Sequence, residues 1–142
     1  GAALGAVIAS QLDEIAGLIA QAETAAEVRR PEVKASLTAA LQRVIEDIAD
    51  VDEARVAQEL ALLAVKSDIT EEIDRLKTHV IAARDLLKDT KPIGRKLDFL
   101  AQEFNREANT LCSKAGASAL TSVGLDLKAV IEQMREQIQN IE

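Results

Sequence analysis

The side chains best suited to chemistry in this sequence lie in two segments whose spacing is helical. In "EEIDRLKTH", residues 71–79, Glu72, Arg75 and His79 recur at intervals of three or four residues, so they share one side of a helix. His79 is the only histidine in the chain. An imidazole near carboxylates can bind a divalent metal or transfer a proton. The same spacing also suits a structural hydrogen-bond network between two helices, and both interpretations remain open.

The second segment, "KLDFLAQEFNREANT", places Glu103 and Glu107 one helical turn apart. Both carboxylates can therefore approach one point, and such groups hold Mg²⁺ or Mn²⁺ at many sites of phosphoryl transfer. Arg106 and Asn109 lie on the same helix, where they could orient phosphate or ribose groups or bridge to neighbouring helices. A short copy of the pattern, "AQEL" at 57–60, places Glu59 as "AQEF" places Glu103.

The apolar residues that must position these side chains recur at helical spacing along most of the chain. Pro31 suits the first position of a second helix, and Asp68 with Glu71 three residues later predicts a capping box. The expected helices are about 2–28, from Pro31 to a break at 47–53, 53–66, 67–87, a segment after Gly94 to about Lys114, and about Ser118 to Ile141.

Composition supports this helical pattern. Hydrophobic residues make up 48% of the 142 residues and aromatic ones only 1%, while Gly and Pro are scarce. Ala, Leu, Ile and Val with few turn residues are typical of helices packed on helices. We therefore expect an all-α fold, an elongated bundle of long amphipathic helices that self-associates, because long amphipathic helices need long partners.

The charge of the chain limits the kinds of ligand it can bind on an open surface. A net charge of −7 disfavours nucleic acid on a uniformly acidic surface, since such binding depends on Lys and Arg that neutralise phosphates. The stretch "KDTKPIGRK" (88–96) is locally basic. It is either a solvated loop or a phosphate contact.

Several familiar classes of protein are not indicated. The sequence has no P-loop, GxGxxG, HExxH or GxSxG motif. Its one cysteine, Cys112, permits neither an internal disulfide nor a cysteine zinc site. The apolar start soon meets acidic residues, and we expect no signal peptide, no membrane span and a cytoplasmic location. The absence of an initiator Met suggests that the chain begins inside a longer protein.

Three stretches resemble the YicC family of bacterial proteins: "ARVAQELALLAVKSDITEEIDRLKTHV", "GRKLDFLAQEFNREANTLCSKA" and "IEQMREQIQNIE". The resemblance implies a stress-associated, cytoplasmic endoribonuclease that needs a divalent cation and forms homo-oligomers, with a hexamer expected for the full-length protein. The resemblance also implies an N-terminal domain ahead of this region, which we do not expect within residues 1–142. We therefore interpret 1–142 as the helical C-terminal region, with a lead-in at 1–50 and motif-bearing helices at 51–142.

These observations lead to one set of candidate residues and two candidate functions. The expected function is cleavage of RNA phosphodiester bonds assisted by Mg²⁺ or Mn²⁺. The alternative is a non-catalytic module for oligomerisation or RNA binding, with the catalytic groups in the missing N-terminal domain. The candidate catalytic residues are His79, Glu72, Glu103 and Glu107; the candidate metal ligands are Glu59, Glu72, Glu103 and Glu107; and the candidate RNA-phosphate contacts are Arg55, Arg75, Arg95, Lys96, Arg106 and Asn109.

Overall fold

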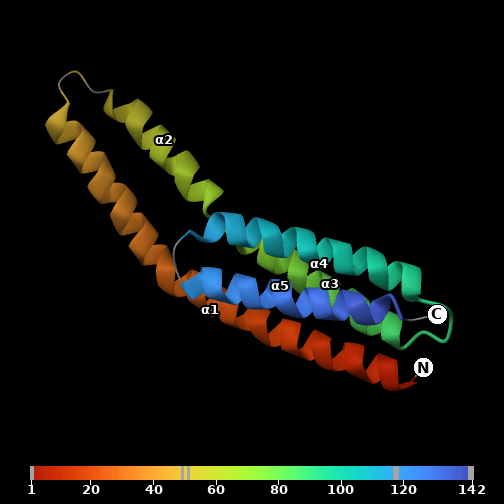
Figure 1. Cartoon of the computed structure of the whole chain (residues 1–142). Coiled ribbons are helices and arrows are strands. Elements are labelled where there is room, and N and C mark those ends of the chain that lie inside the picture. The colour runs from red at the N-terminus through yellow and green to blue at the C-terminus, as the bar shows by residue number, and fades with distance from the viewer. Residues whose placement is uncertain (1, 49, 51, 117–118, 141–142) are drawn as a thin grey trace.

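The part of the chain that the computed structural model describes, residues 2–48, 50, 52–116 and 119–140, is helical with short connections and contains no strand. The prediction of an all-α fold is therefore confirmed. The helices are α1 (Ala2–Asp47), α2 (Glu53–Lys66), α3 (Thr70–Leu87), α4 (Gly94–Ala115) and α5 (Ala119–Ile138) (Figure 1). The predicted first and last residues of the final helix, Ser118 and Ile141, lie outside the described residues.

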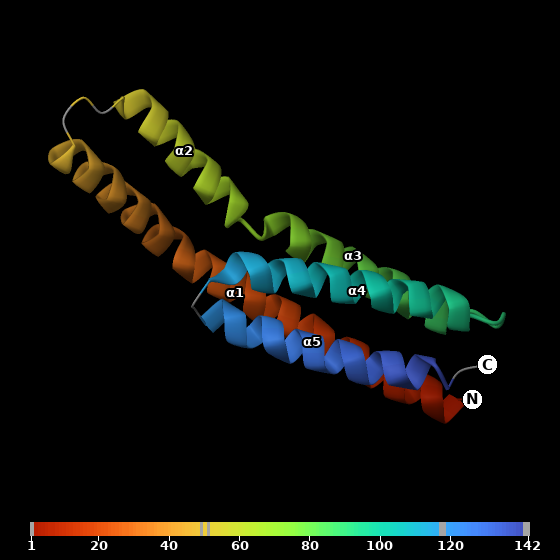
Figure 2. The same cartoon turned by 45° about the horizontal axis from the view of Figure 1, so that its top comes forward.

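The core is a bundle of four helical segments. The N-terminal half of α1 packs against α3 and α5, and α4 packs against the same two helices from the other side (Figures 1 and 2). Each segment contributes residues at intervals of three and four, which is why one face of each can be buried. The buried residues of α4, for example, are Leu97, Ala101, Phe104, Glu107, Ala108, Leu111 and Ala115.

The C-terminal half of α1 and the whole of α2 extend beyond this bundle as a two-helix arm (Figures 1 and 2). The buried residues of α1 all lie between Ile8 and Ala22, and α2 has no buried residue. Apolar side chains of the arm face each other across a groove of about 510 Å³. Residues that line it include Val33, Leu37, Leu41, Leu60, Ala64, Arg29, Arg30 and Lys34.

The predicted break before Pro31 is wrong, because α1 continues through this residue to Asp47. Proline lacks a backbone N–H and its ring crowds the preceding turn, so it can kink a helix instead of ending it. The helix does bend about midway along its length (Figures 1 and 2). Pro31 is the only proline inside it and gives a physical reason for the bend.

The predicted capping box at the start of α3 is also wrong in its partners. One carboxylate oxygen of Asp68 accepts from the backbone N–H of Thr70 at 3.0 Å and from its hydroxyl at 2.6 Å. The residue before α3 is Ile69, which offers no side-chain cap. Glu71 pairs with Arg75 instead of returning to the cap. The side-chain contacts that close the turn locally are thus those of Asp68 with Thr70.

One helix, α1, is long and apolar enough to span a membrane by length and composition, contrary to the sequence-based expectation. Length and composition are weak evidence on their own, since the core helix of a soluble protein meets the same criteria. The N-terminal half of α1 supplies Ile8, Leu12, Ile15 and Ile19 to the core of the bundle. This packing accounts for part of its apolar character, since 22% of the apolar window is buried.

Candidate metal centre

The candidate site lies where α3 and α4 pack antiparallel to one another (Figure 2). His79 is on α3, and Glu103 and Glu107 are on α4. One ligand atom from each of the three side chains can be chosen so that all lie within 4.8 Å of one another. His79 and Glu103 are half-buried, whereas Glu107 is only 3% exposed. The predicted meeting of these three residues across two helices is therefore present.

The imidazole of His79 has an unusual environment for a polar ring. Its edge packs against the buried ring of Phe104 in a T-shaped arrangement, with 5.7 Å between the ring centroids. Its Nε2 atom is buried and makes no hydrogen bond with any residue that the structure describes. A buried polar atom without a partner costs free energy unless something binds it, and a lone imidazole nitrogen is a typical metal ligand.

The geometry of the three residues is compatible with one divalent ion. At bond lengths of about 2.1 Å, octahedral ligands lie about 3 Å apart when adjacent and about 4.2 Å apart when opposite. The observed spread of up to 4.8 Å needs only small side-chain movements to reach those separations. One imidazole and two carboxylates suit Mn²⁺ better than Mg²⁺, which prefers oxygen ligands alone.

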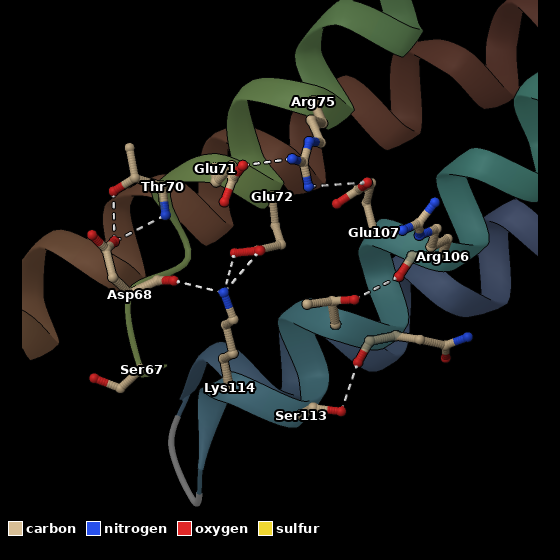
Figure 3. Close-up of polar contacts among 12 residues, drawn as sticks. Ser67, Asp68, Thr70, Glu71, Glu72, Arg75, Arg106, Glu107, Ser113 and Lys114 are labelled. Carbon is tan, nitrogen blue, oxygen red and sulfur yellow. Dashed lines mark hydrogen bonds and ion pairs between the residues drawn. The ribbon is translucent and has the colours of Figure 1, made fainter. Parts of the chain in front are cut away.

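Charged pairs line the interface between α3 and α4 on the Lys114 side of Glu107 (Figure 3). Both carboxylate oxygens of Glu72 accept from the Nζ of Lys114, at 3.0 and 3.1 Å. Lys114 also donates to the backbone oxygen of Asp68 at 3.3 Å. Arg75 lies between this pair and the candidate centre, and its Nη1 atom is 3.7 Å from Oε1 of Glu107. The polar side chains thus form a ladder in antiparallel register.

Glu72 is not part of the three-residue group, although sequence spacing placed it beside His79. It precedes His79 by about two helical turns, and the antiparallel direction of α4 places Lys114 opposite it instead. The side chain is 2% exposed. Lys114 was not among the predicted site residues, and the signal that could have identified it is the antiparallel register of the two helices.

The other predicted site residues are spread over the molecule. Glu59 and Arg55 lie on α2 in the arm, and both are exposed. Neither belongs to the three-residue group. The remaining predicted phosphate contacts on α4 are also exposed: Arg95 and Lys96 at its start, and Arg106 and Asn109 further along.

The electrostatics at the start of α3 are set by local hydrogen bonds. The side-chain and backbone hydrogen bonds from Thr70 lower the pKa of Asp68 and outweigh the opposing desolvation, and the positive charges of Arg30 and Lys114 lower the pKa further. Asp68 is therefore held as a carboxylate at the end of the ladder, where it fixes the turn that leads into α3.

The fold and the site define an all-helical domain with ionisable side chains gathered between two antiparallel helices. The chain belongs to the family described as "Endoribonuclease YicC-like, C-terminal", whose model matches residues 22–142. This match confirms the resemblance found in the sequence.

Two of the curated relatives match the whole chain. One from Haemophilus influenzae, 41% identical over 150 residues, is named "Probable endoribonuclease YicC". One from Clostridioides difficile with the same name is 38% identical over 142 residues. The match covers 48% of each relative. The chain thus spans about half the length of the curated relatives it matches.

Proposed function

We propose that this chain carries the metal-binding part of an endoribonuclease, with His79, Glu103 and Glu107 as the ligands of one divalent cation, Mn²⁺ or Mg²⁺. The observation that supports the proposal most directly is the approach of three ligand atoms to within 4.8 Å of one another. The unpaired, buried Nε2 of His79 supports it independently. Glu59 and Glu72, also predicted as ligands, are left out because one lies on the arm and the other is paired with Lys114.

The neighbouring side chains supply the remaining requirements of phosphodiester cleavage. A bound divalent cation provides a Lewis acid for a phosphoryl oxygen and lowers the pKa of a bound water. Arg75 is half-exposed beside Glu107, so its guanidinium can pair with a phosphate oxygen. Glu107 is buried and held by Arg75, whereas Glu103 and His79 reach solvent in part. The exposed edge of the group is therefore the side from which we expect RNA to approach.

The experiment is a Mn²⁺-binding measurement by electron paramagnetic resonance on the 142-residue chain, followed by cleavage of a single-stranded RNA with and without EDTA. We expect Glu103→Gln and His79→Ala to weaken Mn²⁺ binding at least tenfold and to abolish any cleavage. Glu132→Gln is the matched control, because Glu132 is exposed on α5. The whole Haemophilus influenzae relative, assayed beside the chain, shows whether cleavage needs the additional length. Equal Mn²⁺ binding by the variants and the unaltered chain would refute the proposed centre.

The fact that the chain spans only about half of its relatives favours a second candidate function. In this alternative, the chain is a helical module for oligomerisation and RNA binding, and the catalytic groups lie in the rest of the relative. The exposed apolar side chains of the arm, such as Leu62, Leu63 and Val65, supply a surface for association with other copies. RNA binding by the chain without Mn²⁺ binding and without cleavage would support this alternative.

A further inference from the structure

Phe99 is an exposed aromatic ring on an otherwise polar surface of α4. The chain has two phenylalanines and no Trp or Tyr. Phe104 is completely buried in the core, whereas Phe99 is 61% exposed. A single exposed apolar side chain is common on protein surfaces, so the case for a ligand at Phe99 depends on the charged groups around the ring.

The neighbours of Phe99 on the helix are all polar. Residues three and four positions away share its side of the helix, and these are Lys96 and Arg95 before it and Gln102 and Glu103 after it. The exposed apolar residues of the arm differ from Phe99 because they form a group: Leu62 and Leu63 are adjacent, and Val65 is two residues further on. An interface between two proteins would normally continue the apolar area. An exposed ring beside cations is typical of proteins that bind single-stranded nucleic acid.

Unpaired positive charge lies on one side of the ring and the candidate metal centre on the other. Arg95 and Lys96 are exposed and form no ion pair with another described residue. Glu103 follows Phe99 by four residues, a rise of about 6 Å along the helix. One face of α4 thus presents, in order, two cations, an aromatic ring and a carboxylate of the candidate centre.

The antiparallel register with α3 leaves the ring uncovered. His79 lies opposite Glu103 and Glu107, so the residues of α3 one turn later fall at the level of Phe99. These residues are Ala82 and Ala83, both with small side chains, and the ring of Phe99 remains 61% exposed. A flat ligand can therefore stack on Phe99 while a group attached to it reaches Glu103.

We propose that Phe99 stacks against one base of a single-stranded RNA, while Arg95 and Lys96 hold a phosphate on one side and the adjacent phosphodiester lies at the candidate metal centre on the other. The positive charges beside the ring match the phosphates of RNA. A base paired and stacked within a duplex cannot offer its face to the ring, so the substrate class is single-stranded. The proposal rests on the proposed function for the identity of the ligand.

The test measures RNA affinity in EDTA, so that failure of the metal centre does not affect the result. The probe is a fluorescein-labelled 12-nucleotide RNA of mixed sequence, compared with the same strand in a blunt duplex. Loss of one base–aromatic stack is expected to weaken single-strand binding by Phe99→Ala about 5-fold to 100-fold. Phe99→Trp should retain affinity, and Phe99→Leu, which keeps an apolar side chain without the aromatic face, should behave like Phe99→Ala.

Two further measurements separate stacking from charge and from protein association. Replacement of Arg95 and Lys96 by Gln should reduce the slope of log K against log salt by about 0.7 per charge, whereas Phe99→Ala should leave this slope unchanged. Photo-crosslinking of a 5-iodouridine-substituted strand should modify Phe99. Unchanged single-strand affinity of Phe99→Ala would overturn the proposal. A change in sedimentation of Phe99→Ala without RNA, at unaltered RNA affinity, would overturn it in favour of a protein interface.

Glu103→Gln distinguishes this proposal from the proposed function. In EDTA this variant should bind single-stranded RNA at least as tightly as the unaltered chain, because it removes one negative charge near the strand. In a separate measurement without EDTA, the same variant should lose Mn²⁺ binding. If Glu103→Gln loses Mn²⁺ binding but keeps its affinity for single-stranded RNA, both proposals are supported. If the unaltered chain binds RNA through Phe99 but binds no Mn²⁺, the RNA surface is supported and the metal centre is refuted.

Discussion

The ion pair between Glu72 and Lys114 shows how strongly burial constrains a single residue of this protein. Glu72 is 2% exposed, and the side chain of Lys114 is 27% exposed. Removing a carboxylate from water is costly, and the hydrogen bonds from Lys114 offset that cost only while both partners are present. We therefore interpret Glu72 as a residue that joins α3 to the end of α4.

Glu72→Gln is expected to lower the free energy of unfolding by about 1–3 kcal/mol, the usual effect of losing a hydrogen bond between charged groups. The cost is moderate because the amine of Lys114 can turn towards solvent. Urea unfolding followed by circular dichroism measures it. Glu71→Gln is the matched control, since Glu71 is exposed and pairs on the surface with Arg75, and it should change stability by less than about 1 kcal/mol.

If Glu72→Gln instead leaves stability unchanged and reduces Mn²⁺ binding as strongly as Glu103→Gln, the structural role is wrong. Glu72 would then belong with the ligands, as the sequence suggested.

Asp68 should make stability depend on pH. Because its folded-state pKa lies below the unperturbed value of 3.8, its stabilising effect is complete above that value and is lost as the pH falls through the folded-state pKa. Asp68→Ala should therefore be less stable than the unaltered chain at pH 7, and the difference should shrink below about pH 4. Thermal unfolding of both proteins from pH 7 to pH 2 measures it. A difference that stays constant over this range would contradict the assigned role.

At the residue scale, the sequence predicted the meeting of His79 with Glu103 and Glu107 because all three border the apolar faces of their helices. Border positions become neighbours when those faces pack together. It did not predict that Glu72 would instead meet Lys114, because spacing along one helix does not specify the register of the next. The register of α3 and α4 depends on the connection at 88–93 and on how the apolar faces of the two helices pack against each other.

At the scale of the helices, the bounds of α2 and α4 and the end of α3 follow from local signals, whereas α3 begins at Thr70 and not at the predicted residue 67. Gly94, the Gly116 break and the apolar repeats of α4 predicted a helix close to the observed Gly94–Ala115. The sequence did not predict that α1 continues through Pro31. A proline at the first position of a helix and a proline at a kink inside a helix can have the same local sequence. The turns on both sides decide between them, and here both are helical.

Gly124 permits the close approach of α5 to α4. A Cβ atom at this position would lie 2.6 Å from Sγ of Cys112 and 3.2 Å from Cδ2 of Leu111. Gly124→Ala should therefore cost about 1–3 kcal/mol through overlap, more than the gain of up to about 1 kcal/mol in helix propensity. Urea unfolding measures the net loss.

Gly17→Ala is the matched control for this prediction, because Gly17 is exposed in α1 and a Cβ there meets no atom within 4 Å. This change should raise stability by up to about 1 kcal/mol. A second test combines Cys112→Ala with Gly124→Ala, which removes the sulfur from the overlap and should recover part of the loss. Equal effects of the two single glycine changes would show that packing against α4 is not the reason for Gly124.

At the scale of the whole molecule, the arm is the feature that the sequence could not predict. The apolar residues Leu37, Leu41 and Leu60 have the same spacing as core residues, yet they line the groove between α1 and α2. Periodicity shows that a face is apolar but not what covers it. Self-association through this arm therefore remains a prediction, to be tested by sedimentation of the chain.

Arg29 joins the arm to the bundle at the bend of α1. Its guanidinium donates to the backbone oxygens of Ala115 at 3.1 Å and Lys114 at 3.4 Å, at the end of α4, and to that of Ser67 at the end of α2. A cation at the C-terminal ends of two helices is favourable, because it binds carbonyl groups that lack helical partners. One side chain thus fixes the positions of three helices relative to one another.

Arg29→Met keeps most of the aliphatic stem but removes these bonds, and we expect a loss of about 2–3 kcal/mol in the free energy of unfolding. The loss should be concentrated where the carbonyls are released, so amide hydrogen exchange should accelerate in 63–70 and near the end of α4 while the core of α5 stays protected. Arg30→Met is the matched control, because Arg30 is exposed and pairs with Glu27 on the surface. If both variants exchange alike, the arm is held to the bundle by the continuity of α1 alone and not by Arg29.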